Sequence, residues 1–135
     1  MTGETDLKTL ISHMRPMLDP EPYVFCTFTA RDFQDLADYG PVGLFAETEG
    51  TTAILPVERA RELGLGDAEW FRRITLTVHS SLEAVGLTAA ISSALAERGI
   101  SANVVAAYFH DHIFVPEEKA DEALKTLREL ADSTL

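Results

Sequence analysis

Apolar and polar positions change their period several times in the C-terminal half of the chain, and each change predicts a new element. Residues 74–79 alternate between apolar and polar side chains, which is the period of a strand with one buried face. After Gly86, apolar residues recur at helical spacing as far as Gly99, a residue suited to the left-handed turn that ends many helices. Two apolar stretches follow, at 104–109 and 113–115. The pattern therefore predicts strand, helix, strand, hairpin and strand in that order.

The N-terminal half shows similar patterns, and an amphipathic helix follows the last strand. A helix is predicted at 6–14, where apolar residues fall on one face and Thr5 or Asp6 can cap the first turn. The proline-rich residues 19–22 are predicted to form a stiff connector. The other predicted elements are a strand at 23–29, a short helix within 30–39, a hairpin of strands 43–48 and 51–55 with its turn at Glu49-Gly50, and helices at 56–63 and 117–130.

Three stretches of the C-terminal half carry a resemblance to a known family. They are the turn at Gly86, the helix exit Ala-Glu-Arg-Gly-Ile-Ser at 96–101, and Asp-His-Ile-Phe-Val-Pro at 111–116. Together they resemble the ACT domain, a small ferredoxin-like regulatory module that binds amino acids. The Asp-x-Ile-x-Val form is similar to that of tandem-ACT amino-acid sensors and aspartokinase regulatory regions. Many ACT domains carry Pro-Gly at the first turn, whereas this chain carries Val85-Gly86.

The resemblance and the order of elements together imply an α+β fold of two ferredoxin-like, βαββα lobes, with antiparallel sheets and helices on one face. We expect an N-terminal lobe with a leading helix at 1–69 and a C-terminal ACT domain at 70–135. The resemblance is weaker over 1–73, where the order of elements alone supports it. The ferredoxin-like plan needs a fourth strand after the last helix, but the sequence stops there. We therefore predict a continuous or intertwined sheet and a homodimer, because an open sheet edge favours pairing.

The right-handed crossover between parallel strands brings the loop 79–86 and the hairpin 110–112 to one edge of the predicted sheet. Backbone N–H groups at the helix start can accept a carboxylate, and Asp111 can bind an ammonium group. The resemblance to ACT domains implies that these residues bind an amino acid. Gly86 and Asp111 are also ordinary turn residues, so a purely structural role stays open. The predicted ligand-binding residues are Ser80, Ser81, Val85, Gly86, Leu87, Thr88, Asp111, His112 and Ile113.

Charge and composition narrow the classes of partner. The chain of 135 residues has 22 acidic and 11 basic residues, a net charge of −11, which disfavours nucleic-acid and anionic-membrane binding. We find neither a membrane-spanning apolar run nor a signal peptide, and therefore expect a cytoplasmic protein. Cys26 is the single cysteine, so no disulfide can form within the chain, and its apolar surroundings predict a buried side chain.

Metal binding and catalysis are alternatives with less support. His79, His110 and His112 could converge on zinc, but the turn predicted at Asp111 separates the last two, and we expect no metal or other cofactor. We expect no enzyme activity, because the chain lacks the nucleophile-elbow, P-loop and dinucleotide-binding glycine patterns. The alternative function is a ligand-free interaction module that pairs through an open sheet edge and the region of Trp70-Phe71. The preferred interpretation of these two aromatic residues is that they fill a seam between the lobes, since large aromatic side chains are normally buried.

Overall fold

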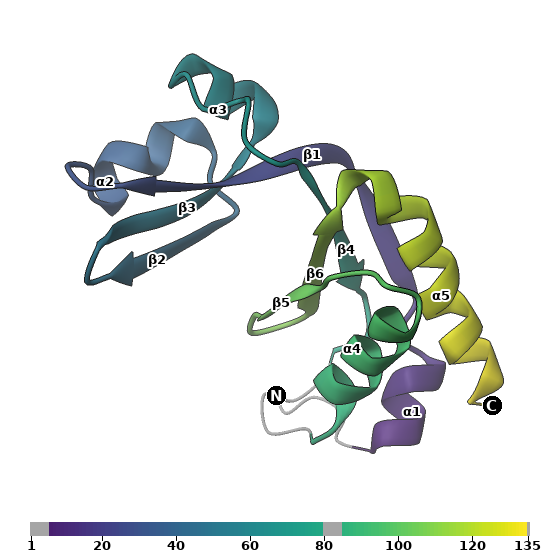
Figure 1. The fold of residues 1–135 in the computed structure, drawn as a ribbon. Helices are drawn as coiled ribbons and strands as arrows, with labels where there is room; N and C mark the ends of the chain where they lie inside the picture. The colour runs from purple at the N-terminus through teal and green to yellow at the C-terminus, as the bar shows by residue number, and fades with distance from the viewer. Residues whose placement is uncertain (1–5, 80–84, 135) are drawn as a thin grey trace. The chain divides into compact units, whose positions relative to one another are not determined.

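The structure, a computed structural model, describes residues 6–79 and 85–134 and divides the chain into two compact units (Figure 1). One unit combines Met1–Pro20 with Arg72–Leu135, and the other is Glu21–Phe71. The described strands are β1 (Pro16–Phe28), β2 (Gly43–Glu47), β3 (Gly50–Pro56), β4 (Phe71–Leu76), β5 (Asn103–Ala106) and β6 (Asp111–Pro116). The described helices are α1 (Leu7–Ser12), α2 (Phe33–Leu36), α3 (Val57–Glu62), α4 (Leu87–Glu97) and α5 (Ala120–Ser133), with short 3-10 turns at Ala37–Tyr39 and Glu117–Lys119.

The strand order confirms the ferredoxin-like α+β fold. In the unit that holds the C-terminal part of the chain the order is β1-β4-β6-β5, and in the other unit it is β2-β3-β1. Strand β1 contributes to both, and the pairings of β1 with β3, β2 with β3 and β5 with β6 are antiparallel. The first part of β1 thus supplies the fourth strand that the C-terminal part of the sequence lacks.

Helix α1 packs with the C-terminal part of the chain and not with the lobe that follows it in sequence. Asp6 caps the helix, since its carboxylate accepts a hydrogen bond from the backbone N–H of Thr9 at 3.1 Å. Leu10 and Met14 are fully buried in a core shared with α4, α5, β4 and β6 (Figure 1). In the structure the leading helix therefore belongs to the compact unit of the C-terminal part of the chain. A helix of six residues has little stability on its own, so its position depends on where its apolar face can be buried.

Residues 19–22 lie inside β1, so the predicted connector is wrong as well. Proline fixes φ near the value of extended backbone, and it is tolerated in a strand where its missing N–H is not needed for pairing. The first part of this strand runs beside β4. There the backbone N–H of Thr77 donates to the carbonyl of Met14 at 2.9 Å, and the Arg72 side chain donates to the carbonyl of Asp19 at 2.7 Å.

The Glu21–Phe71 unit has its own core, formed by the end of β1, β3, α2 and α3. Its hairpin turn is Thr48-Glu49, one residue before the predicted turn, because Glu47 pairs with Gly50. Gly50 has a φ of +154°, and a Cβ atom there would lie 2.5 Å from the carbonyl oxygen of Phe28. The close approach of β1 therefore requires glycine at position 50. Gly50 is the first residue of β3 and not part of the turn.

Trp70 packs within this same unit. Its indole N–H donates to the carbonyl of Gly66 at 2.8 Å, and the Arg61 guanidinium lies over the ring at 5.2 Å from its centroid. Phe71 makes an edge-to-face contact with Phe25, with the ring centroids 5.2 Å apart. These contacts give both aromatic residues partners inside the unit.

No helix in the described part of the chain is long and apolar enough to cross a membrane.

The second hairpin turns earlier than its apolar residues predict. β5 ends at Ala106 and β6 begins at Asp111, with these two residues paired, so the turn is 107–110. The prediction of a strand through 109 and a turn at Asp111 is wrong. The register is fixed by the core, since pairing Val104 with Ile113 keeps both on the helix-covered face. Tyr108 and Phe109 are left exposed in the turn despite their preference for strands.

Candidate functional site

The predicted ligand site centres on the start of α4. Gly86 is its N-cap with a φ of +96°, and among residues 6–79 and 85–134 no side chain caps this end of the helix. Val85 and Thr88 are exposed, whereas the Leu87 side chain is buried in the core. Ser80 and Ser81 lie outside the described residues. The peptide N–H groups of the first turn of α4 have no hydrogen-bond partner within the helix, so they are the groups that this part of the site offers to a ligand.

Helix α1 lies close to Gly86. A Cβ atom at Gly86 would be 3.2 Å from Cδ2 of Leu7. The positive φ and the nearby leucine both favour glycine here, so Gly86 has a structural reason to be present whether or not a ligand binds. The leading helix consequently borders the predicted site, a neighbour that the sequence alone does not reveal.

The three predicted residues of the hairpin face different sides of the sheet. Asp111 and Ile113 alternate with His112 along β6, and Ile113 belongs to the core under the helices. Asp111, 8% exposed, therefore lies on the helix-covered face, where Leu87 also packs. His112 lies on the opposite face. The structure places Asp111 and Ile113 on the same side of the sheet as α4 and separates His112 from them.

His112 is part of a polar group on the sheet face without helices. Its Nδ1 atom lies 2.9 Å from the hydroxyl of Thr75, within hydrogen-bond distance. On the same strand as Thr75, Arg73 forms an ion pair with Asp19 at 2.8 Å. Burial lowers the pKa of His112, and the positive charge of Arg73 and neighbouring His110 lower it further, with Asp111 acting in the opposite sense. His112 is consequently held in its neutral form more strongly than an exposed histidine.

The lowered pKa of His112 makes stability depend on pH. Below the ordinary histidine pKa of 6.5, His112 takes up a proton more readily in the unfolded chain than in the folded protein. The free energy of unfolding therefore decreases as the pH is lowered through this range. We expect the urea midpoint to drop between about pH 7.5 and about pH 5.5, and His112→Gln to reduce this drop. The exposed His13, replaced by glutamine, is the matched control. Equal pH profiles for His112→Gln and the unchanged protein would contradict this assignment.

The other histidines also have separate surroundings. His110 Nδ1 lies 3.4 Å from the carbonyl oxygen of Val78, and the His79 ring stacks at a tilt on Phe109 with centroids 5.5 Å apart. Among residues 6–79 and 85–134, no group of three or more histidine, cysteine, aspartate and glutamate side chains is placed to hold a metal ion.

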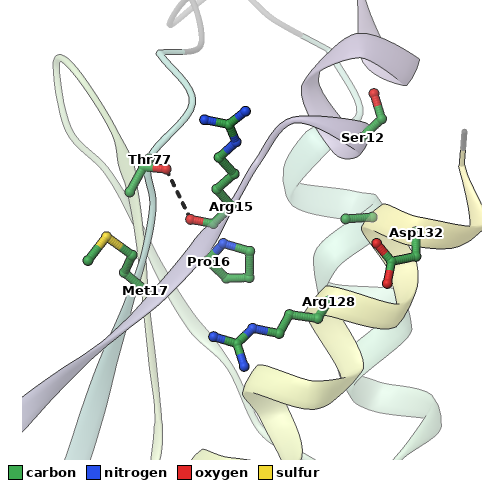
Figure 2. A pocket seen from close by; sticks show the side chains of 8 residues that line it. Ser12, Arg15, Pro16, Met17, Thr77, Arg128 and Asp132 are labelled. Carbon is green, nitrogen blue, oxygen red and sulfur yellow. Dashed lines mark hydrogen bonds between the residues drawn. The ribbon is translucent and has the colours of Figure 1, made fainter.

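A hollow lies between α1, the start of β1, the residue after β4 and α5, and it has no counterpart in the sequence predictions. We call it the arginine hollow. It has a volume of about 630 Å³ (Figure 2). Its polar and apolar lining includes Ser12, Arg15, Met17, Thr77, Arg128 and Asp132. These residues come from three distant segments of the chain and form no local motif, so no sequence signal could have grouped them.

Comparisons with known proteins identify the family. Two family models, both described as ACT domain, match residues 2–72 and 72–129. No curated protein matches the chain. Among solved structures, a protein of unknown function from Vibrio cholerae, titled a possible transport protein, is 50% identical with a TM-score of 0.83, covering 93% of this chain and 95% of that one.

More distant structures share the fold. A protein from Agrobacterium tumefaciens is 15% identical with a TM-score of 0.65, over 82% of this chain and 84% of that one. The ligand-free regulatory subunit of aspartate kinase from Thermus thermophilus is 13% identical with a TM-score of 0.59, over 85% of this chain and 95% of that one. ACT domains are regulatory modules, which supports a regulatory, ligand-binding role. The chain belongs to the ACT-domain family and carries two ACT domains in tandem.

Proposed function

We propose that this protein is a stand-alone regulator that binds a free amino acid where α4 begins. The observation that carries the proposal is the start of α4 at Gly86, which no side chain of the described residues caps and where backbone N–H groups can bind a carboxylate at the positive end of the helix. Val85 and Leu87 contribute through their backbone, and Thr88 through its exposed hydroxyl. Ser80 and Ser81 belong to the same proposal, although they lie outside the described residues.

Asp111 is the proposed partner of the ligand's ammonium group. It lies at the beginning of β6 on the helix-covered face, next in alternation to Ile113. A mostly buried carboxylate strengthens a charge-assisted hydrogen bond, because the surroundings screen it less than water does. His112 takes no direct part in this version of the site, since it lies on the opposite face of the sheet.

Regulation would follow from a change in subunit arrangement. In the strand orders above, β5 ends one unit's sheet and β2 ends the other's, and an end strand can pair with a second chain. A homodimer formed in this way would respond to a ligand that binds one arrangement more tightly than another. The cytoplasmic location expected from the sequence stays part of this proposal.

A thermal-shift screen against the twenty amino acids tests the proposal. An amino acid at a hundred times its dissociation constant should stabilise the folded protein by about 2.7 kcal/mol, and size-exclusion chromatography should show whether it changes the oligomer. Asp111→Asn should abolish the shift while keeping a similar melting temperature without ligand. The control variant is Asp121→Asn, an exposed carboxylate in the first turn of α5, which should keep the full shift.

A flat response to all twenty amino acids would reject the amino-acid proposal. It would favour the second candidate, a ligand-free interaction module. That candidate is supported by the exposed apolar side chains of Val105, Tyr108 and Phe109 on β5 and the adjoining turn. Its prediction is that Tyr108→Ser and Phe109→Ser weaken self-association without lowering the melting temperature of the monomer.

A further inference from the structure

Acidic charge is concentrated in the unit formed by Glu21–Phe71. This stretch holds ten acidic and three basic residues, which leaves a net charge of −7. All three basic side chains have contacts within the unit: Arg59 and Arg61 pair with glutamates, and the Arg31 guanidinium lies over the Phe28 ring. The surface of this unit therefore attracts cationic partners and repels anionic ones.

The sheet of the same unit has an apolar face that its helices do not cover. Helices α2 and α3 pack on one side of β1 and β3, and side chains alternate along each strand, so Phe25, Phe45 and Ile54 lie on the other side. Ile54 lies between β1 and β2 and leans over Gly43, where a Cβ atom would be 3.0 Å from its Cδ1 atom. Phe25 is partly exposed and Phe45 is 69% exposed. This face thus presents phenylalanine side chains to solvent on a strongly acidic unit.

Strand β2, which carries Phe45, is the outer strand of this unit (Figure 1). Among the described residues it pairs with β3 alone, in an unbroken register over Gly43–Glu47. Lysine, proline or a bulge commonly protects an edge strand from further pairing, and β2 contains none of these. Its outward-facing backbone N–H and C=O groups are therefore available to an added strand.

The side chains along this edge define the class of partner. Phe45 and Glu47 lie two residues apart on the same face, and the Glu47 carboxylate accepts a hydrogen bond from the Thr52 hydroxyl. A strand added beside β2 would place one side chain about 5 Å from each of them. An apolar side chain suits Phe45, and a lysine or arginine suits Glu47 and the neighbouring Glu49. A second copy of the chain suits this edge less well, because it would bring another unit of charge −7 to it.

We propose that the edge of β2 binds an extended segment of a partner protein in which an apolar residue and a lysine or arginine stand two positions apart. The segment would extend the β2-β3-β1 sheet by backbone hydrogen bonds, with its apolar side chain beside Phe45 and its cation beside Glu47. The end strand β5 is left for the proposed homodimer. The β2 edge shares no residue with the amino-acid site proposed at Gly86 and Asp111, so each proposal can fail without the other.

The test is an NMR titration of the full chain with the end-blocked peptide GTVTKTKG, in which valine and both lysines share one face of a strand. We expect saturable shifts of the backbone amide signals of β2, with a dissociation constant on the order of 0.5 mM. The peptide GTVTETEG, with glutamate in place of lysine, should bind at least about tenfold more weakly, because like charges oppose each other across the strands. Raising sodium chloride from about 50 mM to about 300 mM should weaken the binding of the lysine peptide by screening.

Two variants of β2 test the assigned contacts. Phe45→Ser should weaken binding of GTVTKTKG about fivefold and Glu47→Gln about threefold, the losses expected for one apolar and one charged cross-strand pair. Both side chains are exposed, so neither change removes core packing. Phe33→Ser on α2 and Asp38→Asn in the turn after it are the matched controls, because they make similar changes at exposed positions on elements that cover the other face. They should leave the affinity unchanged.

The proposal is overturned if GTVTKTKG gives no saturable shift by about 5 mM, a limit well above the expected dissociation constant. It is equally overturned if the shifted signals lie outside β2, if GTVTETEG binds as tightly, or if the control variants weaken binding as much as the β2 variants. Shifts of the β2 signals when the protein alone is concentrated would also overturn it, because the edge would then pair with a second copy of this chain.

Discussion

Leu10→Ala is expected to lower the free energy of unfolding by about 2–5 kcal/mol, the usual cost of removing a fully buried leucine. Leu10 is 0% exposed and packs, with Met14, into the core formed mainly by the C-terminal part of the chain. The loss combines the transfer of apolar atoms with the cavity left behind, since α4 and α5 can close only part of the gap. Urea denaturation followed by circular dichroism measures it.

Leu7→Ala in the same helix provides the comparison. Leu7 is 36% exposed, and we expect a loss of about 1 kcal/mol, because much of its surface stays in contact with water. If the two variants lose the same small amount of stability, α1 is not an integral part of this core. The Leu7 variant also removes the side chain that lies against Gly86, so its ligand response reports on whether the leading helix restricts the proposed amino-acid site.

Asp19→Asn is expected to cost about 3 kcal/mol, because it removes a carboxylate with which the mostly buried Arg73 guanidinium forms an ion pair. The two side chains are 17% and 24% exposed and lie 2.8 Å apart, which links the first part of β1 to β4. Pairs with this little exposure differ from surface pairs, since water no longer solvates a charge whose partner is removed. The measured quantity is the free energy of unfolding at neutral pH.

A surface pair gives the control for this prediction. Arg98 and Glu129 lie 3.5 Å apart, with side chains 44% and 49% exposed. Glu129→Gln should cost less than about 1 kcal/mol, and a double-mutant cycle on each pair isolates the two coupling energies. If Asp19→Asn is no more destabilising than Glu129→Gln, the Asp19–Arg73 pair makes no special contribution to joining these strands.

Both predictions concern the packing of the N-terminal segment, α1 and the start of β1, against the C-terminal part of the chain. Helix α1 buries its apolar face there, and the start of β1 supplies a fourth strand beside β4. The arginine hollow exists only because of this arrangement, since its lining joins α1 and the start of β1 with the residue after β4 and with α5.

The order of elements and the family were readable from the sequence because local patterns encode them. Alternation in 74–79 and helical spacing after Gly86 reflect which residues face a core, whatever that core contains. Glycine permits the left-handed conformation that Gly86 and Gly99 adopt, and both residues were expected at helix ends. The match to ACT domains rests on this local information.

Tertiary structure decided which residues meet. The turn of the second hairpin moved to 107–110 because core packing sets the register and overrides the β-preference of Tyr108 and Phe109. Because β6 begins at Asp111, both Asp111 and His112 lie in the strand and point to opposite faces of the sheet, whereas the predicted site placed them in a turn. Periodicity assigns a residue to a face of its own element, but the partner of that face depends on long-range packing. Hence the sequence predicted α1 as a helix, while only the fold showed that it completes the C-terminal unit and forms the arginine hollow.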